Sequence, residues 1–169
     1  MNCLEYAKAE DIEICSQIIE EGKRFQRQQG FVQWTDDYPN RETISEDIKE
    51  KKGYILRSDG EIAGYMCIDF SGEPAYEGIE GKWRSDGKYA VIHRMAFHPR
   101  FRDKGLADIT FGLIEKLCLS KKIHCIRVDT DFPNKRMQHI LEKNGFSQCG
   151  VIVFQGSGKL AYDKLLDPS

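Results

Sequence analysis

The stretch Tyr89–Ser120, YAVIHRMAFHPRFRDKGLADITFGLIEKLCLS, decides the fold of this chain. Residues 89–97 are rich in β-branched and aromatic side chains, which favour a buried strand. Pro99 ends that strand, because proline cannot donate to a sheet ladder. Apolar side chains then recur at helical spacing, at Leu106, Ile109, Leu113, Ile114 and Leu117. The stretch therefore predicts a strand, a turn and a helix in that order.

The turn itself, residues 102–107, reads RDKGLA. The start of a helix leaves backbone N–H groups without partners and carries partial positive charge. Gly105 has no Cβ, so a ligand can approach the backbone closely there, and Arg100, Arg102 and Lys104 add positive charge. These features favour a phosphate or pyrophosphate site. The alternative is an ordinary turn with a solvated basic rim, since many helix starts bind no anion.

Three segments resemble the GNAT superfamily of N-acyltransferases. The pattern Arg102-x-x-Gly105-x-Ala107 is similar to that family's acyl-CoA pyrophosphate loop, and residues 93–99, HRMAFHP, are similar to its fourth strand. The segment from Asn134 to Phe146 resembles the family's N…LYEKxGF pattern. The loop alone is a weak signal, but the three segments at this separation form a specific one.

The resemblance implies an α/β fold, namely a single-domain GNAT-like mixed sheet of about seven strands flanked by about four helices. In that family the fourth and fifth strands splay apart. The length of 169 residues also favours one domain over residues 1–169. Local patterns predict strands at 3–7, 54–57, 61–70, 89–97, 125–130, 151–155 and 160–164. They predict helices from Asp11, over 41–51, after Gly105 and after Asn134, and an irregular acidic segment over 72–83.

The resemblance further implies acetyl-CoA as a co-substrate, with no metal. Its pantetheine arm would pair with the fourth strand like an added strand, using main-chain hydrogen bonds. Its pyrophosphate would rest on the N–H groups of the turn. The cofactor-binding residues so implied are Met95, Ala96, Phe97, Arg102, Asp103, Lys104, Gly105, Leu106, Ala107 and Asn134.

Acyl transfer to an amine needs a neutral amine and a stabilised oxyanion, and the leaving thiolate can be protonated. A backbone N–H near Met95 can stabilise the oxyanion. Three side chains are candidate bases: His93, Glu77 and Glu80. Period-two alternation would place His93 on the same strand face as Met95, and histidine has a free pKa of about 6.5. The alternatives are a structural core histidine and a solvated acidic loop.

One residue departs from the family pattern. Leu141 stands where the family commonly has a tyrosine that acts as general acid, and leucine cannot donate a proton. The leading hypothesis is an N-acetyltransferase that moves an acetyl group to a primary amine of a small molecule or peptide, by direct attack in a ternary complex. The alternative from another class is an acyl-CoA sensor without turnover, which the leucine favours.

The connection after the first predicted helix holds an unusual density of aromatic residues, Phe31, Trp34 and Tyr38. Either they pack against the core, or they form a lid over an acceptor pocket, since binding residues often sit on loops. The resemblance implies that the first two helices flank the acceptor. The acidic segment Glu73–Glu80 suggests a cationic acceptor by charge complementarity.

Composition narrows the remaining classes of function. The net charge of −2 argues against nucleic acid and anionic membranes as partners, although Arg94, Arg100, Arg102 and Lys104 leave nucleic-acid binding as a weaker third hypothesis. No apolar run reaches the roughly 18 residues of a membrane helix, and the first residues lack the apolar core of a secretory signal. We therefore expect a cytoplasmic protein, with a homodimer as a family expectation.

The six cysteines are scattered, with no C-x-x-C pair and no histidine cluster of the kind that binds zinc. Cys15, Cys67 and Cys118 fall within apolar patterns. We expect free thiols, mostly buried, in a reducing compartment.

Overall fold

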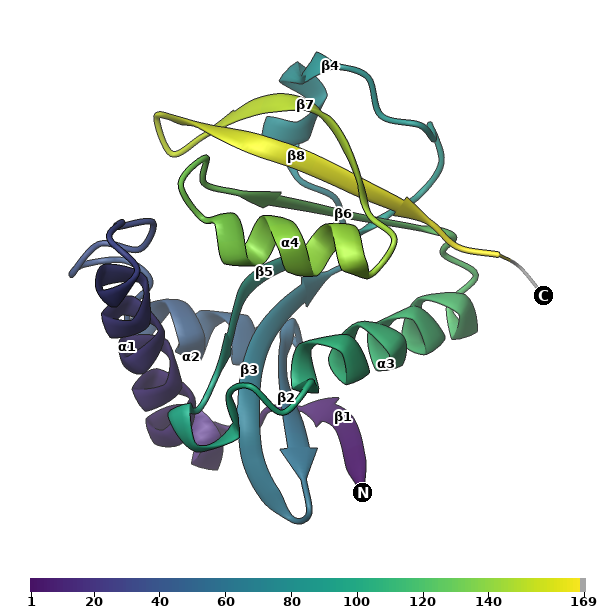
Figure 1. Ribbon diagram of the computed structural model, residues 1–169. Coiled ribbons are helices and arrows are strands. Elements are labelled where there is room, and N and C mark those ends of the chain that lie inside the picture. The colour runs from purple at the N-terminus through teal and green to yellow at the C-terminus, as the bar shows by residue number, and fades with distance from the viewer. Residues whose placement is uncertain (168–169) are drawn as a thin grey trace. The chain divides into compact units, whose positions relative to one another are not determined.

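A computed structural model describes residues 1–167 (Figure 1). The chain divides into two compact units, each built from two separate segments. Unit 1 comprises Met1–Ile68 and His93–Leu113, and unit 2 comprises Asp69–Ile92 and the chain from Ile114 onward. The strand and the helix of the deciding stretch run through both units.

The α-helices are α1 (Ile12–Gln28), α2 (Arg41–Lys49), α3 (Leu106–Ser120) and α4 (Lys135–Lys143). The strands are β1 (Asn2–Tyr6), β2 (Gly53–Ser58), β3 (Glu61–Asp69), β4 (Glu80–Gly81), β5 (Ala90–Phe97), β6 (Cys125–Thr130), β7 (Ser147–Phe154) and β8 (Ser157–Leu165). The short 3₁₀ helices within residues 1–167 are η1 (Ala9–Asp11), η2 (Pro74–Gly78) and η3 (Pro99–Phe101).

Hydrogen-bonded neighbours follow the order β1-β2-β3-β5-β6-β8-β7-β4. The pairing of β5 with β6 is parallel, whereas β1–β2, β2–β3, β6–β8, β7–β8 and β4–β7 are antiparallel, so the predicted mixed α/β sheet is confirmed. In unit 2 the β5–β6 register joins Ala90 to Ile126 and Val91 to Arg127. The rest of β5, from His93 to Phe97, belongs to unit 1.

The core of unit 1 gathers one face of α1 and α2 against β2, β3 and β5. Its buried members are Ala7, Cys15, Ile18, Ile19, Ile44, Ile55, Tyr65 and Ala96. On α1, Cys15, Ile18 and Ile19 therefore form an apolar stripe that faces inward. On α3 the expected stripe is wrong at one position, because Ile109 is 39% exposed while Phe111, Ile114 and Cys118 are buried.

The core of unit 2 includes residues from the segment 72–83, which the sequence predicted to be irregular. Tyr76, Trp83, Val91, Ile152 and Ala161 are buried together there. The segment contains η2 and the two-residue strand β4, so the expectation of an irregular loop is wrong, and the sheet has eight strands instead of about seven. In Figure 1 the strands β7 and β8 form the long hairpin at the C-terminal end of the colour scale.

The cysteines are free thiols, as expected. Cys15, Cys67, Cys118 and Cys125 are buried, Cys149 is half-buried and Cys3 is exposed. Burial, with a smaller effect of a nearby carboxylate, raises the pKa of Cys15 and of Cys118 to about 12. These thiols therefore stay protonated and unreactive at neutral pH.

Candidate active site

The turn between β5 and α3 has the backbone of an anion cradle. Asp103 and Gly105 both adopt left-handed conformations, with φ of 62° and 72°. A Cβ placed on Gly105 would meet no other atom within 4 Å, so the space beside this residue is open. Ile109 donates its N–H to the Gly105 carbonyl at 3.3 Å, so the N–H groups of Leu106 and Ala107 precede the ladder of α3. The turn thus combines an open backbone with the positive end of a helix.

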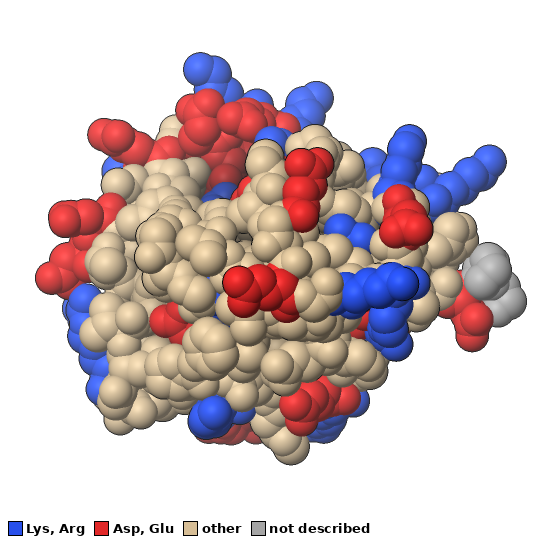
Figure 2. All heavy atoms as spheres, turned by 90° about the horizontal axis from the view of Figure 1, so that it is seen from above, with Lys and Arg blue, Asp and Glu red and all other residues tan. Residues whose placement is uncertain are grey.

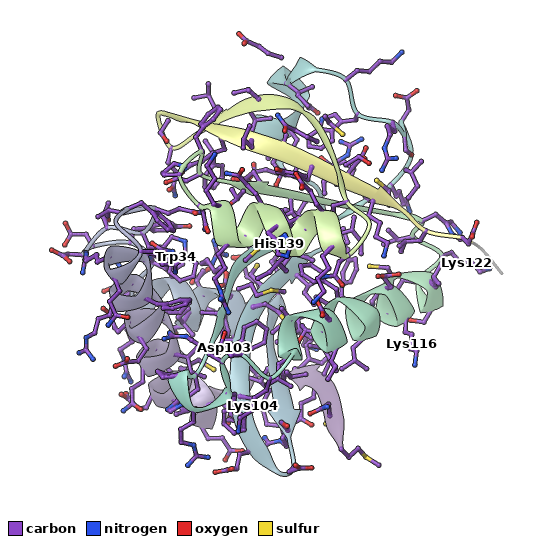
Figure 3. All side chains as sticks on the ribbon, viewed as in Figure 1. Trp34, Asp103, Lys104, Lys116, Lys122 and His139 are labelled. Atoms are coloured by element: carbon purple, nitrogen blue, oxygen red, sulfur yellow. The ribbon has the colours of Figure 1, made fainter. Side chains whose placement is uncertain are left out.

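The basic side chains around the turn make contacts of their own. The Arg102 guanidinium lies 4.1 Å from the centroid of the Phe25 ring on α1, and its Nη2 donates to the Glu21 carbonyl at 3.2 Å. Arg100 forms an exposed ion pair with Glu61. Figure 3 labels Asp103 and Lys104 on the turn that leads into α3. Arg102 therefore anchors the turn to α1, and the groups suited to an anion here are chiefly backbone N–H groups.

The cofactor residues predicted on β5 are held closely against β3. Ala96 is buried, and Met95 and Phe97 are half-buried. A Cβ on Gly64 of β3 would lie 2.7 Å from Cδ1 of Phe97 and 3.1 Å from the Ala96 carbonyl oxygen. The absence of a side chain at Gly64 therefore lets the Phe97 ring pack across β3, and pairing with a ligand would use the main chain of β5.

Within β5, Arg94 has a left-handed backbone with φ of 54°. A residue with a Cβ seldom adopts this conformation, and it interrupts the regular pleat of a strand. The alternation that would place His93 and Met95 on one face does not hold across such a residue. His93 is half-buried, and its role as a base stays a prediction.

The Arg94 side chain enters a buried polar cluster that the sequence analysis did not identify. Its Nη2 donates to Asp47 Oδ1 at 2.7 Å and its Nε donates to Asp47 Oδ2 at 3.0 Å. Tyr65 donates its hydroxyl to the same Oδ2 at 2.7 Å, and Arg94 Nη1 donates to the Tyr38 hydroxyl at 2.9 Å. Burial acts to lower the pKa of Arg94, but the hydrogen bond to Asp47 and the nearby negative charge outweigh it, so the net shift is upward.

The aromatic connection is built into unit 1. Phe31 is buried, and Gln26 Oε1 accepts from the Trp34 backbone N–H at 2.9 Å. A Cβ on Gly22 of α1 would lie 2.9 Å from Cζ3 of Trp34, so the indole ring occupies the space that this glycine leaves. Phe31 and Trp34 therefore pack against the core, the simpler of the two interpretations, and acceptor binding by these residues and Tyr38 remains a prediction.

In unit 2 the two predicted carboxylates are exposed. Glu77 lies on η2 and Glu80 on β4. Unit 2 also contains a hydrogen-bonded pair that the sequence analysis missed. The Tyr76 hydroxyl donates to Asp129 Oδ1 at 2.6 Å. Burial raises the pKa of Asp129, against the opposing effects of this hydrogen bond and of Lys159. Burial and the Asp129 charge raise the pKa of Tyr76 well above its ordinary value.

Two further residues of unit 2 were singled out from the sequence. Asn134 caps α4 as predicted, since its Oδ1 accepts from the Met137 N–H at 3.1 Å. Its contact with pantetheine stays a prediction. Leu141, at the position where the family commonly has tyrosine, is fully buried on α4 and fills core space.

The surface carries charges of both signs on the face that Figure 2 shows, in keeping with the net charge of −2. Within residues 1–167, no helix is both long enough and apolar enough to cross a bilayer. The same residues contain no group of three or more His, Cys, Asp or Glu side chains placed to hold a metal ion.

Comparison with known proteins bears on this arrangement. A sequence model of the acetyltransferase (GNAT) family matches residues 17–146. A GNAT-family acetyltransferase from Streptococcus agalactiae is 34% identical and superposes with a TM-score of 0.89, over 98% of this chain and 96% of that one. A putative acetyltransferase from Staphylococcus aureus is 25% identical, with a TM-score of 0.72 over 97% and 99% of the two chains. No curated protein matches the chain.

A more distant structure shares the fold alone. It is AAC(6')-Ib in complex with ribostamycin and coenzyme A, which is 16% identical with a TM-score of 0.72, over 97% of this chain and 93% of that one. The family match covers most of the chain, so the protein belongs to the GNAT acetyltransferase family. Its class of activity is acyl transfer.

Proposed function

We propose that the protein is an N-acetyltransferase that moves an acetyl group from acetyl-CoA to a primary amine of a small molecule or peptide. The observation that carries this proposal is the turn between β5 and α3. Gly105 is left-handed beside open space, and the N–H groups of Leu106 and Ala107 precede the ladder of α3. These features suit a pyrophosphate, which needs backbone donors more than particular side chains.

The residues present fit acetyl-CoA in a second respect. Met95, Ala96 and Phe97 of β5 offer main-chain groups for an extended arm, while the Ala96 and Phe97 side chains pack within unit 1. Bound there, acetyl-CoA supplies an acetyl group on a thioester. The Met95 N–H is the proposed donor to the oxyanion, and such donors are among the largest contributions to acyl-transfer catalysis.

The proposed reaction is direct attack in a ternary complex. The amine nitrogen forms a bond to the acetyl carbon, the carbon–sulfur bond breaks, and the proton lost by the amine goes to a base. His93, Glu77 and Glu80 remain the candidate bases from the sequence. With Leu141 in the core, the thiolate leaves unassisted or takes a proton from water.

The acceptor is proposed as a class only. The acidic segment from Glu73 to Glu80 supports a cationic amine by complementarity. AAC(6')-Ib, a protein of the same fold, binds an aminoglycoside together with coenzyme A, which supports a small polyamine as one form of acceptor.

The experiment has two arms. Titration calorimetry with acetyl-CoA measures binding, and release of free thiol in the presence of amino acids, polyamines, aminoglycosides and peptides measures transfer. We expect binding, together with amine-dependent thiol release and an acetylated product identified by mass spectrometry. Binding without release from any amine would favour the acyl-CoA sensor, and no binding would overturn both.

The base is identified by the pH dependence of kcat/KM. If His93 takes the amine proton, His93→Gln should lower kcat by roughly 10²–10⁴-fold and remove the acid limb of the profile. Glu77→Gln and Glu80→Gln should leave that limb in place. Loss of the limb in one of these two variants, with its survival in His93→Gln, would assign the base to that carboxylate.

A further inference from the structure

Four side chains from separate parts of unit 1 meet at the left-handed residue of β5. Asp47 comes from α2, Tyr65 from β3, Tyr38 from the connection after α1, and Arg94 from β5 itself. Asp47 is buried and Arg94 is largely buried, with side-chain exposures of 9% and 13%. We call these four residues the Arg94 cluster.

The geometry of the cluster fixes the orientation of the guanidinium group. Both Asp47 oxygens accept from Arg94, at 2.7 and 3.0 Å, and Tyr65 holds one of those oxygens at 2.7 Å. A planar guanidinium in a two-point bond with a carboxylate has little rotational freedom. Buried ion pairs of this kind often add no stability over an apolar pair of similar volume. In this cluster the ion pair fixes the orientation of the Arg94 guanidinium group.

The Arg94 cluster also holds the backbone of β5 at Arg94. Arg94 has φ of 54°, a conformation that is unfavourable for a residue with a Cβ and that persists where the surroundings hold it. The peptide group between Arg94 and Met95 carries the Met95 N–H. Its direction depends on the backbone angles at these two residues, so whatever holds Arg94 also directs that N–H.

We infer that the Arg94 cluster is a positioning network, which holds the Arg94–Met95 peptide so that the Met95 N–H points at the developing oxyanion. Through Tyr38 the same network ties the aromatic connection to the strand. The inference rests on the proposed function, in which the Met95 N–H is the oxyanion donor. The four side chains are positioning residues, since each acts through the backbone of β5.

The test separates positioning from stability by comparing a single with a double substitution. Asp47→Asn removes the charge of one partner, whereas Asp47→Leu with Arg94→Met replaces the pair by apolar side chains. We expect Asp47→Asn to lower both the Tm and kcat, kcat by about 10–100-fold, because small misplacements of catalytic groups have effects of this size. The double variant should recover most of the Tm and keep the low kcat.

In both variants the Kd for acetyl-CoA should change by a smaller factor than kcat, because the turn that binds the pyrophosphate lacks the cluster residues. The matched control is Glu5→Leu with Arg57→Met, which removes the ion pair of 2.9 Å between β1 and β2 and should leave kcat unchanged. Recovery of kcat together with Tm in the double variant would overturn the inference and leave the cluster a purely structural role.

A second measurement needs no turnover. The NMR order parameter of the Met95 amide should be near 0.85 in the wild type, as for rigid backbone, and fall below about 0.6 in the double variant. The Ile55 amide in β2 serves as the internal reference and should not change. Unchanged Met95 order in the double variant would overturn the inference even if the wild type transfers no acetyl group, whereas absence of thiol release alone would count only against the proposed function.

Discussion

Each unit of the molecule holds a carboxylate against a fully buried tyrosine, and the two carboxylates have different further partners. In unit 1, Asp47 accepts from the Tyr65 hydroxyl and also from Nε and Nη2 of Arg94. In unit 2, Asp129 accepts from Tyr76, while the nearby Lys159 amine bonds to Asp131 instead. Asp47 has a full counter-charge in direct contact and is suited to hold a structure.

The contrast matters for chemistry. Burial raises the pKa of Asp129, so its protonation can change closer to neutral pH than that of an ordinary aspartate. Asp47, by contrast, is held in a two-point ion pair with Arg94. The comparison therefore associates a fixed geometry with the Arg94 cluster of unit 1 and a raised carboxyl pKa with the Tyr76–Asp129 pair of unit 2.

The largest effect expected is on stability. Asp47→Ala should lower the free energy of unfolding by about 3–5 kcal/mol, because it leaves the buried Arg94 charge without its partner. Urea denaturation followed by circular dichroism measures the difference. The control is Glu5→Ala, which removes a more exposed ion pair with Arg57 and should cost less than about 1 kcal/mol. Equal losses in the two variants would mean that the Asp47 pair is no more important than a surface one.

The next largest effect expected is on acetyl-CoA affinity, which depends on the turn between β5 and α3 and not on either carboxylate. Gly105→Glu should weaken acetyl-CoA binding by about 100-fold or more in calorimetry, because it strains a left-handed position and places a negative charge in the open space beside the turn. Gly112→Glu adds the same charge on the exposed face of α3, at a glycine whose Cβ would also meet nothing, and should leave the affinity unchanged. A folded Gly105→Glu protein with wild-type affinity would show that the pyrophosphate binds elsewhere.

A smaller effect compares the two tyrosines directly. Tyr65 and Tyr76 are both fully buried and both donate to a carboxylate. Tyr76→Phe should cost about 2–3 kcal/mol in unfolding free energy, because Asp129 loses its hydroxyl donor. Tyr65→Phe should cost about 1 kcal/mol, since the Asp47 carboxylate keeps both bonds from Arg94. A larger loss of unfolding free energy in Tyr65→Phe than in Tyr76→Phe would contradict the view that Arg94 still satisfies the Asp47 carboxylate when the tyrosine hydroxyl is removed.

The smallest effect concerns pH. The folded-state pKa of Asp129 is raised above its ordinary value of 3.8, so on increasing pH the unfolded chain loses this proton before the folded protein does. The wild type therefore loses stability as the pH rises from about 3.8 through the raised value, and Asp129→Asn does not titrate there. The difference in Tm between Asp129→Asn and the wild type should shift in favour of the variant over this range and then stay level. A difference independent of pH would contradict the raised pKa.

Local signals predicted much of the fold. The strand–turn–helix around Gly105 follows from the periodicity of neighbouring residues. So does the strand β6, which was predicted as 125–130 and is found as Cys125–Thr130. The two-residue strand β4 has no such signal. A Cβ on Gly81 would lie 2.2 Å from the Cys149 carbonyl oxygen, and a Cβ on Gly150 would lie 2.1 Å from that of Glu80. The pairing of β4 with β7 therefore depends on two glycines far apart in the sequence.

The candidate site divides in the same way. The turn could be predicted, because its glycine, its helix start and its neighbouring charges are contiguous. The Arg94–Asp47 pair joins residues 47 positions apart, and the Tyr76–Asp129 pair joins residues 53 positions apart. Such pairs follow from tertiary structure. A signal was available in the charged residues that stand among apolar ones within strands, such as Arg94 in AVIHRMAF and Asp129 in CIRVDT.

The discontinuous make-up of the two units has a consequence for how the protein is made. Unit 1 needs His93–Leu113, so its first 68 residues cannot be completed as they leave the ribosome. At synthesis rates of about 5–20 residues per second, the roughly 45 residues that follow take about 2–9 s to appear. During that interval the edge of β3 that pairs with β5 in the finished sheet has no partner strand. An exposed strand edge is a template for aggregation, so the nascent chain is most vulnerable in those seconds.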